Sequence, residues 1–358
     1  MNFKIAIQPD QLQLDNGLNE SYSERWICRA RDLGHEVVVV DVFCDDIVDQ
    51  LGPCDGFMWR FTHAPFPRLF AKRFVIAVEH GLDLIVFPDW RTCWHYDDKI
   101  AQYYLLTAAG IPTPRTWVFW RPEDALRFCR SASYPLVIKL SGGASSENVR
   151  IIEDFGKAKY WIGQMFSSGV FSLQSADSIG FRERMRRFRS AFLCILRGQL
   201  PNPGFWFELN KNYLLVQEFL HGNQFDTRVT IIGNRAFAFR RFNRPDDFRA
   251  SGSGDFSTDP SEVDLQFVRL GFNTAYALGA QSLAVDGLYG GNERVIAEIS
   301  YTYVAWVIHE CPGHWELRGS PATGELIWRE GHIRSEDAIM EDFLQKINLK
   351  YREKFALS

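Results

Sequence analysis

A hairpin with a carboxylate on each strand most restricts what this chain can fold into. Residues 284–300 read AVDGLYGGNERVIAEIS, and the two apolar runs around GGN predict two strands joined by a tight turn. If the hairpin folds about Asn292, Asp286 lies opposite Glu298. Side chains that face each other across antiparallel strands have Cβ atoms about 4.5–5.5 Å apart. The pattern therefore predicts two carboxylates in close contact.

Two carboxylates this close repel, and one is driven to take up a proton unless a cation lies between them. A hard divalent ion such as Mg²⁺ suits the pair, because it takes oxygen ligands and keeps some waters and substrate phosphates. Alternation of side chains along a strand puts Ser300 on the same face as Glu298. The stretch alone leaves two interpretations open, a metal site and a solvent-facing hairpin with two unrelated acids.

The whole chain has the composition of an ordinary globular protein. Its 358 residues are enough for two or three domains, with 46% hydrophobic and 23% charged residues. The net charge of −4 gives no general case for nucleic-acid binding. Seven scattered cysteines without a CxxC pair suit a reducing cytoplasm. We find no signal peptide and no run of about 20 apolar residues that could span a bilayer.

The first ~95 residues alternate predicted strands and helices, which is typical of an open α/β layer. Residues 36–43, EVVVVDVF, predict a buried parallel strand. The absence of GxGxxG argues against a dinucleotide-binding domain. Asp97 and Asp98 can cap a helix that ends at Gly110. A smaller unit of strands and helices follows, and then antiparallel strands that include the hairpin.

Lys139 ends an apolar strand immediately before the loop SGGASS. A buried ammonium is costly without an anion, and glycines let backbone N–H groups approach a phosphate closely. The alternative is a strand-end lysine beside a flexible turn, since the Walker pattern is absent. Lys99 follows Asp98 and is, by itself, best interpreted as a surface lysine.

Three further sites have polar residues at suggestive spacings. Glu218 and Phe219 can hold an adenine-like base through backbone hydrogen bonds and an aromatic wall. Asp226 and Arg228 share one strand face, where the alternative is a surface ion pair. Arg249 lies at the mouth of a glycine-serine loop and suits bidentate recognition of phosphate or carboxylate, unless that loop is only a disordered surface segment.

Taken in order, these features resemble the ATP-grasp superfamily. The chain runs DKIAQYYLLTAAGIPTP, a strand lysine with a glycine loop, QEF, DxR, FRASGSG, and then Asp and ExS on the hairpin. Within the superfamily they are most similar to the ribosomal S6 modification enzyme and D-alanine–D-alanine ligase types. The resemblance implies an α/β (α+β ATP-grasp) fold. A Rossmann-like pre-ATP-grasp domain at residues 1–96 would precede two α+β subdomains that clasp ATP, at 97–215 and 216–358.

The resemblance also implies roles for individual residues. The residues it places at ATP are Lys99, Lys139, Ser141, Gly142, Gly143, Ser145, Glu218, Phe219, Asp226, Arg249 and Ser251. Within this set, residues 141–146 match the mobile flap, residues 218–219 the adenine hinge and Asp226 the polar residue near the ribose. Lys139 and Arg249 are the implied catalytic residues. Asp286, Glu298 and Ser300 are the implied ligands of Mg²⁺, with Mn²⁺ as the alternative ion. The family usually has Glu-x-Asn here, so Ser300 leaves open whether one or two ions bind.

The resemblance implies an ATP-dependent ligase that forms an amide through an acyl phosphate. Its partners would be a small-molecule or glycan carboxylate and an amine, with no nucleic acid, in a cytoplasmic protein that can form a homodimer. Two alternatives remain: an ATP-grasp kinase without ligation, and a nucleotide-binding regulator without turnover. Residues 155–212 form a long insertion whose basic stretch, residues 182–197, is either a solvated helix or a peripheral contact for an anionic surface.

Overall fold

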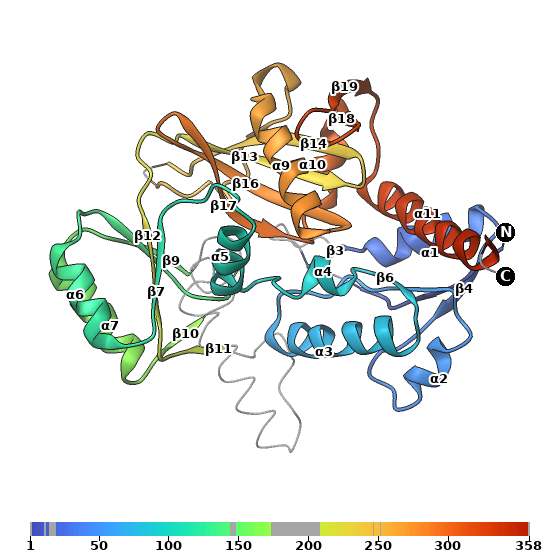
Figure 1. Cartoon of the computed structure of the whole chain (residues 1–358), viewed down its shortest axis with the longest axis horizontal. Coiled ribbons are helices and arrows are strands. Elements are labelled where there is room, and N and C mark those ends of the chain that lie inside the picture. Colours follow the sequence, from blue (N-terminus) through green and yellow to red (C-terminus); the bar gives the residue numbers. More distant parts are fainter. Residues whose placement is uncertain are drawn as a thin grey trace.

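The N-terminal layer of the computed structural model is a parallel sheet with the strand order β4-β1-β5-β6 (Figure 1). Its strands are β1 (Lys4–Ile7), β4 (Glu36–Val39), β5 (Gly56–Met58) and β6 (Ile85–Phe87). Its helices are α1 (Tyr22–Asp32), α2 (Ile47–Leu51), α3 (Pro65–Gly81) and α4 (Trp90–Cys93), and the short strands β2 (Leu12–Gln13) and β3 (Asn19–Glu20) pair with each other. The structure describes residues 2–10, 12–13, 19–143, 148–172, 208–245, 247–250 and 252–356.

The apolar run EVVVVDVF forms a parallel strand, as predicted, but the prediction that this strand is buried is wrong. β4 lies at the edge of the sheet, and Val39 is 51% exposed. The buried part of the run is Val40 and Val42, which follow the last strand residue and enter the core beside α3. Apolarity alone therefore did not distinguish a central strand from an edge strand that leads into the core.

The second sheet is antiparallel and has the order β7-β12-β8-β9. Its strands are β7 (Thr116–Phe119), β8 (Leu136–Lys139), β9 (Val149–Ile152) and β12 (Leu214–Glu218). α6 (Pro122–Ser131) and α7 (Phe155–Phe166) pack against each other and share its core. Beyond α7, β10 (Val170–Ser172) pairs with β11 (Glu208–Asn210). The basic stretch 182–197 lies outside the described residues.

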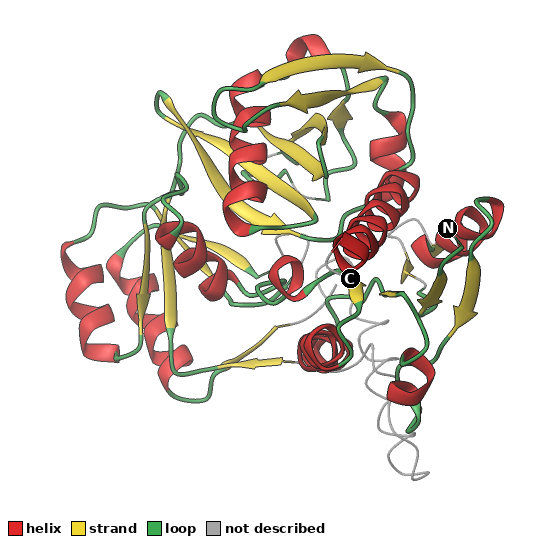
Figure 2. Ribbon diagram, turned by 45° about the vertical axis from the view of Figure 1, so that its right-hand side comes forward, coloured by secondary structure: helices red, strands yellow, loops and turns green. Residues whose placement is uncertain are grey.

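The third sheet has seven strands in the order β17-β16-β13-β14-β18-β19, with β15 paired to β14. Figure 2 shows the strands of this sheet, in yellow, in the upper part of the molecule. The strands are β13 (Phe225–Ile232), β14 (Arg235–Phe242), β15 (Phe256–Ser257), β16 (Ser282–Gly290), β17 (Glu293–Ser300), β18 (Gly313–Arg318) and β19 (Glu325–Glu330). α9 (Leu265–Leu278) packs on β13 and β16 and ends at Gly279, whose φ of 65° suits a glycine at a helix C-terminus.

The C-terminal helix returns to the N-terminal layer. After α10 (Ala305–Glu310), α11 (Ser335–Ala356) packs against α1. The rings of Phe3 and Tyr351 stack with their centroids 5.8 Å apart. Phe3 and Trp26 share one hydrophobic core with Phe343 and Ile347. The first and last parts of the described chain are therefore one folding unit. None of the helices in the described ranges is both long and apolar enough to cross a membrane.

Candidate functional site

The hairpin formed by β16 and β17 brings the two predicted carboxylates together. The sheet register pairs Asp286 with Glu298, so this prediction is confirmed. The turn itself is centred between Gly291 and Asn292, because Gly290 pairs with Glu293. A shift in register next to Asp286 leaves Ala297 unpaired as a β-bulge. With the turn at this position, an unbroken ladder would pair Asp286 with Ala297. The bulge shifts the register by one residue, so that Asp286 pairs with Glu298 as predicted.

Asp286 is held by two arginines on neighbouring strands. Arg228 lies directly opposite it on β13 and donates from Nε to Oδ1 at 2.7 Å and from Nη2 to Oδ2 at 2.8 Å. Arg241 on β14 adds a third contact, from Nη2 to Oδ2 at 2.8 Å. Burial alone would raise the pKa of Asp286, but the two guanidinium groups outweigh it and hold the pKa well below its usual range. The carboxylate is therefore ionised.

Asp226 completes what we call the arginine–carboxylate cluster, which consists of Asp226, Arg228, Arg241 and Asp286. Its two oxygens accept hydrogen bonds of 2.7 and 2.6 Å from Arg241. Asp226 and Asp286 are both buried. The surface ion pair between Asp226 and Arg228 considered above is therefore wrong, because each pairs across strands instead. Contact of Asp226 with a ribose stays a prediction.

Lys99 connects the second carboxylate to the glycine-rich loop. It begins α5 (Lys99–Ala108), and Asp98 caps this helix by accepting a hydrogen bond from the Ala101 N–H at 3.0 Å. Lys99 is only 7% exposed, so its interpretation as a surface lysine is wrong. Its Nζ lies 3.2 Å from Oε1 of Glu298 and donates to the Gly143 carbonyl at 2.9 Å. Burial opposes the charge of Lys99, but Glu298 and Asp97 raise its pKa above the ordinary value.

Lys139 faces the same pocket from the second sheet. The pocket lies between α5, that sheet and the hairpin, and its polar lining includes Lys99, Gln102, Lys139 and Gln217, with the bulged Ala297 opposite. Removal from water lowers the pKa of Lys139 to about 8, although Glu298 opposes the shift. An ammonium with so few partners is suited to an anionic ligand.

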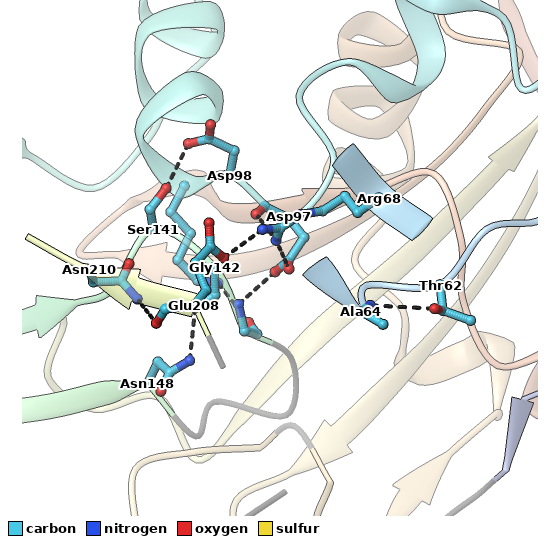
Figure 3. Close-up of polar contacts among 12 residues, drawn as sticks. Thr62, Ala64, Arg68, Asp97, Asp98, Ser141, Gly142, Asn148, Glu208 and Asn210 are labelled. Carbon is cyan, nitrogen blue, oxygen red and sulfur yellow. Dashed lines mark hydrogen bonds and ion pairs between the residues drawn. The ribbon is translucent and has the colours of Figure 1, made fainter. Parts of the chain in front are cut away.

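The first residues of the glycine-rich loop are anchored to the chain before α5 (Figure 3). Ser141 donates from Oγ to Asp98 at 2.8 Å, and its N–H donates to the Tyr213 hydroxyl at 2.7 Å. The Gly143 N–H donates to Oδ1 of Asp97 at 2.7 Å. Gly143 has a φ of 118°, which disfavours any other residue there. The loop is therefore fixed at its base, and Ser145 lies outside the described residues.

Sequence reasoning missed the charged residues beneath this loop. Arg68 of α3 pairs with the Asp97 carboxylate, donates to the Asp97 carbonyl at 2.9 Å and contacts Oε2 of Glu208 at 2.5 Å (Figure 3). A Cβ at Gly142 would lie 3.0 Å from both Arg68 and Glu208. Three distant segments thus meet under Gly142, and no local signal in the sequence joins them.

The predicted adenine hinge points its carboxylate away from the pocket. Glu218 accepts hydrogen bonds from the N–H and Nε of Arg115, at 2.7 and 2.8 Å. Its neighbour Gln217 lines the pocket instead and donates to the Thr116 hydroxyl at 2.9 Å. Sequence reasoning missed Gln217, although the register that pairs Leu215 with Lys139 puts residues 215 and 217 on the pocket face.

The predicted phosphate arginine lies close to the hinge in space. Phe248 packs edge-on against Phe219, with ring centroids 5.7 Å apart. The adjacent Arg249 pairs through Nη2 with Oδ2 of Asp247 at 2.7 Å. Ser251 lies outside the described residues. Contact of Arg249 with phosphate stays a prediction.

The donor atoms on the hairpin suit a hard metal ion. Asp286 and Glu298 supply carboxylate oxygens, and Ser300 follows Glu298 on the same face. The Ser300 hydroxyl donates its proton to the Thr302 carbonyl at 2.7 Å, which leaves its oxygen lone pairs for a ligand. Within the described ranges, no three His, Cys, Asp or Glu side chains gather closely enough to hold an ion. Two carboxylates and a hydroxyl are oxygen donors of the kind that Mg²⁺ takes alongside waters and substrate phosphates.

Comparison with known proteins finds structural neighbours across most of the chain, although no protein-family model matches it. D-alanine–D-alanine ligase from Bacillus anthracis, complexed with ATP, superposes with a TM-score of 0.51 at 12% identity, covering 98% of this chain and 99% of that one. N5-carboxyaminoimidazole synthetase from Staphylococcus aureus gives a TM-score of 0.52 at 12% identity, covering 87% and 74%. The biotin carboxylase domain of a 2-oxoglutarate carboxylase from Hydrogenobacter thermophilus also gives 0.52 at 12% identity, covering 85% and 65%.

A relative is also found by sequence. Phosphoribosylamine–glycine ligase from Caldanaerobacter subterraneus subsp. tengcongensis is 33% identical over 89 residues. This match spans 25% of the present chain and 21% of the relative. The sequence likeness is thus local, whereas the structural likeness extends over the whole architecture and shows a shared fold.

Proposed function

The chain has the ATP-grasp fold, as predicted from its sequence, and on that basis we propose that it is an ATP-dependent carboxylate–amine ligase. The observation that carries the proposal is the position of two lysines in one pocket, with a pair of carboxylates beside one of them. Lys99 and Lys139 line it, and Glu298 contacts Lys99 while Asp286 lies opposite Glu298. Cations that bind phosphate, next to acids that suit Mg²⁺, are the combination that phosphoryl transfer from ATP requires.

The proposed reaction has two steps. A carboxylate oxygen of the first substrate attacks the γ-phosphorus of ATP, and the bond to the β-γ bridging oxygen breaks to release ADP. The acyl phosphate is then attacked at its carbonyl carbon by an amine, which loses a proton, and phosphate leaves. The intermediate replaces a poor leaving group with a good one.

The chain's residues serve this reaction chiefly by placing charge. Lys99 and Lys139 hold phosphate oxygens, and Arg249 grips the developing acyl phosphate. Asp286, Glu298 and the Ser300 hydroxyl hold Mg²⁺, which neutralises phosphate charge when bound. Gln217 offers the pocket a side-chain amide for a purine edge. The domain boundaries, the cytoplasmic location, the homodimer and the contact of residues 182–197 with an anionic surface stay predictions.

The function is tested by following ADP release from ATP and Mg²⁺ with a panel of carboxylic acids, each with and without amines. If the protein is a ligase, hydroxylamine converts its acyl phosphate to a hydroxamate. With the right amine the product is an amide, which is detected by its mass. A phosphorylated product that persists with every amine would identify a kinase. Nucleotide binding without ADP release for any acid would identify a regulator. The Glu298→Gln variant is the control that ties turnover to this site.

A further inference from the structure

Asp286 and Glu298, the two carboxylates proposed to hold Mg²⁺, already have cationic partners. Oδ1 of Asp286 accepts from Nε of Arg228, and Oδ2 accepts from Nη2 of both Arg228 and Arg241. Oε1 of Glu298 lies 3.2 Å from Nζ of Lys99. Both oxygens of Asp286 thus accept from guanidinium groups, one on β13 next to β16 and one on β14, a strand further along the same sheet.

The charges around the pair do not favour a lone divalent cation. The cations are Lys99, Lys139, Arg228 and Arg241, and the anions are Asp226, Asp286 and Glu298. A metal ion that approaches Asp286 therefore meets more positive than negative side chains. It must also displace hydrogen bonds of 2.7 to 2.8 Å from a buried carboxylate. Polyphosphate would reverse this balance, because it brings several negative charges that the same cations can bind.

We propose that Arg228 and Arg241 act as a latch on Asp286 that only nucleotide releases. In the nucleotide-free protein they neutralise Asp286. With nucleotide present they exchange that carboxylate for phosphate oxygens, and Asp286 becomes a metal ligand. This inference rests on the proposed function and deepens it: Arg228 and Arg241 couple metal affinity to nucleotide binding. By reciprocity, metal and nucleotide strengthen each other's binding at this site.

Arg228 is the better residue to test, because its side chain makes no carboxylate contact other than Asp286 in the described contacts. Arg241 also holds Asp226, so its loss would leave a second buried carboxylate without a partner. Arg228→Gln keeps a hydrogen-bond donor and removes one charge. Arg294→Gln is the matched control, because Arg294 lies on the same hairpin but pairs with Asp264 at 2.8 Å instead.

The experiment measures Mn²⁺ binding to the full chain by the loss of the free-ion paramagnetic resonance signal, first without nucleotide and then with ADP. We expect Arg228→Gln to bind Mn²⁺ on the order of tenfold more tightly than wild type without nucleotide. With ADP present the gain should disappear, and Arg294→Gln should match wild type in both states. Equal or weaker nucleotide-free Mn²⁺ binding by Arg228→Gln would overturn the latch.

A second variant covers the remaining half of the cluster. Asp226→Asn with Arg241→Gln removes a cation together with its other partner, and it should also tighten nucleotide-free Mn²⁺ binding. ADP binding to the wild type, measured by calorimetry, distinguishes failure of the latch from failure of the proposed function. If ADP binds and neither variant gains Mn²⁺ affinity, the latch is wrong and the nucleotide site stands. If the wild type binds no ADP or ATP, the proposed function itself fails.

Discussion

Asp286 and Glu298 face each other because Ala297 bulges out of the ladder between β16 and β17. From the turn to Gly287 the strands pair in one register, and beyond the bulge they pair in a register shifted by one residue. If Ala297 paired with Asp286 in an unbroken register, Glu298 would lie on the opposite face of the sheet, away from Asp286. Ile296 and Ala297, at the bulge, both line the pocket. One unpaired residue therefore sets the apposition of the two carboxylates and contributes to the pocket wall.

The two carboxylates should differ in what their loss does to stability. Asp286→Asn and Glu298→Gln should each reduce Mg²⁺-dependent ATP turnover at least about 100-fold, because each removes a ligand charge. Asp286→Asn should also lower the melting temperature by several degrees, and by more than Glu298→Gln, since it leaves two guanidinium groups without their buried partner, whereas Glu298 contacts Lys99 alone. Phosphate release against Mg²⁺ concentration and thermal unfolding check both. Near-normal turnover at limiting Mg²⁺ would remove the hairpin from the active site.

Nucleotide affinity should depend on pH through Lys139. The pKa of Lys139 is about 8 without ligand, and bound phosphate would raise it by favouring the ammonium. Affinity for ADP should therefore be constant below about pH 7 and fall about tenfold per pH unit above 8. Calorimetry across pH 6.5–9.5 measures this. Lys139→Arg, which stays charged over the whole range, should flatten the profile, and an unchanged slope in that variant would assign the titration to another group.

The sequence predicted local features of this site better than distant ones. The cap at Asp98 and the apposition of Asp286 with Glu298 are encoded within a few residues, and both are confirmed. The pairing of Arg228 with Asp286 depends instead on the register of strands 58 residues apart, to which hydrophobic patterns contribute little. Gln217 was missed for the same reason, because only the pairing of β12 with β8 shows which face it occupies.

The base of the glycine-rich loop should be protected from hydrogen exchange even without nucleotide. Gly143 donates to Asp97 and Ser141 donates to the Tyr213 hydroxyl, so the two amides are held independently. Asp97→Ala should speed exchange at Gly143 on the order of tenfold and leave Ser141 unchanged. Tyr213→Phe should do the reverse. If either variant releases both amides together, the base of the loop opens as one unit and the two anchors are not independent.

His95 should make the fold sensitive to acid. It is fully buried, neither ring nitrogen has a hydrogen-bond partner, and burial lowers its pKa to about 4. The unfolded chain takes up the proton near pH 6.5. Stability linked to His95 is therefore complete above pH 6.5 and is lost as the pH falls toward 4.

His95→Phe should remove this acid sensitivity. The melting temperature of the variant, relative to wild type, should be higher at pH 5 than at pH 7.5. A His95→Phe profile parallel to that of wild type would show that His95 does not cause the acid sensitivity.

The return of α11 to the N-terminal layer has a consequence for how the protein is made. Phe3 and Trp26 leave the ribosome long before Phe343 and Ile347, which pack in the same core. Until then the apolar surface of this layer stays exposed, although the two later sheets can already close. The N-terminal layer is thus completed only after both later sheets, and a growing polypeptide of this kind depends on protection from aggregation until α11 has been synthesised.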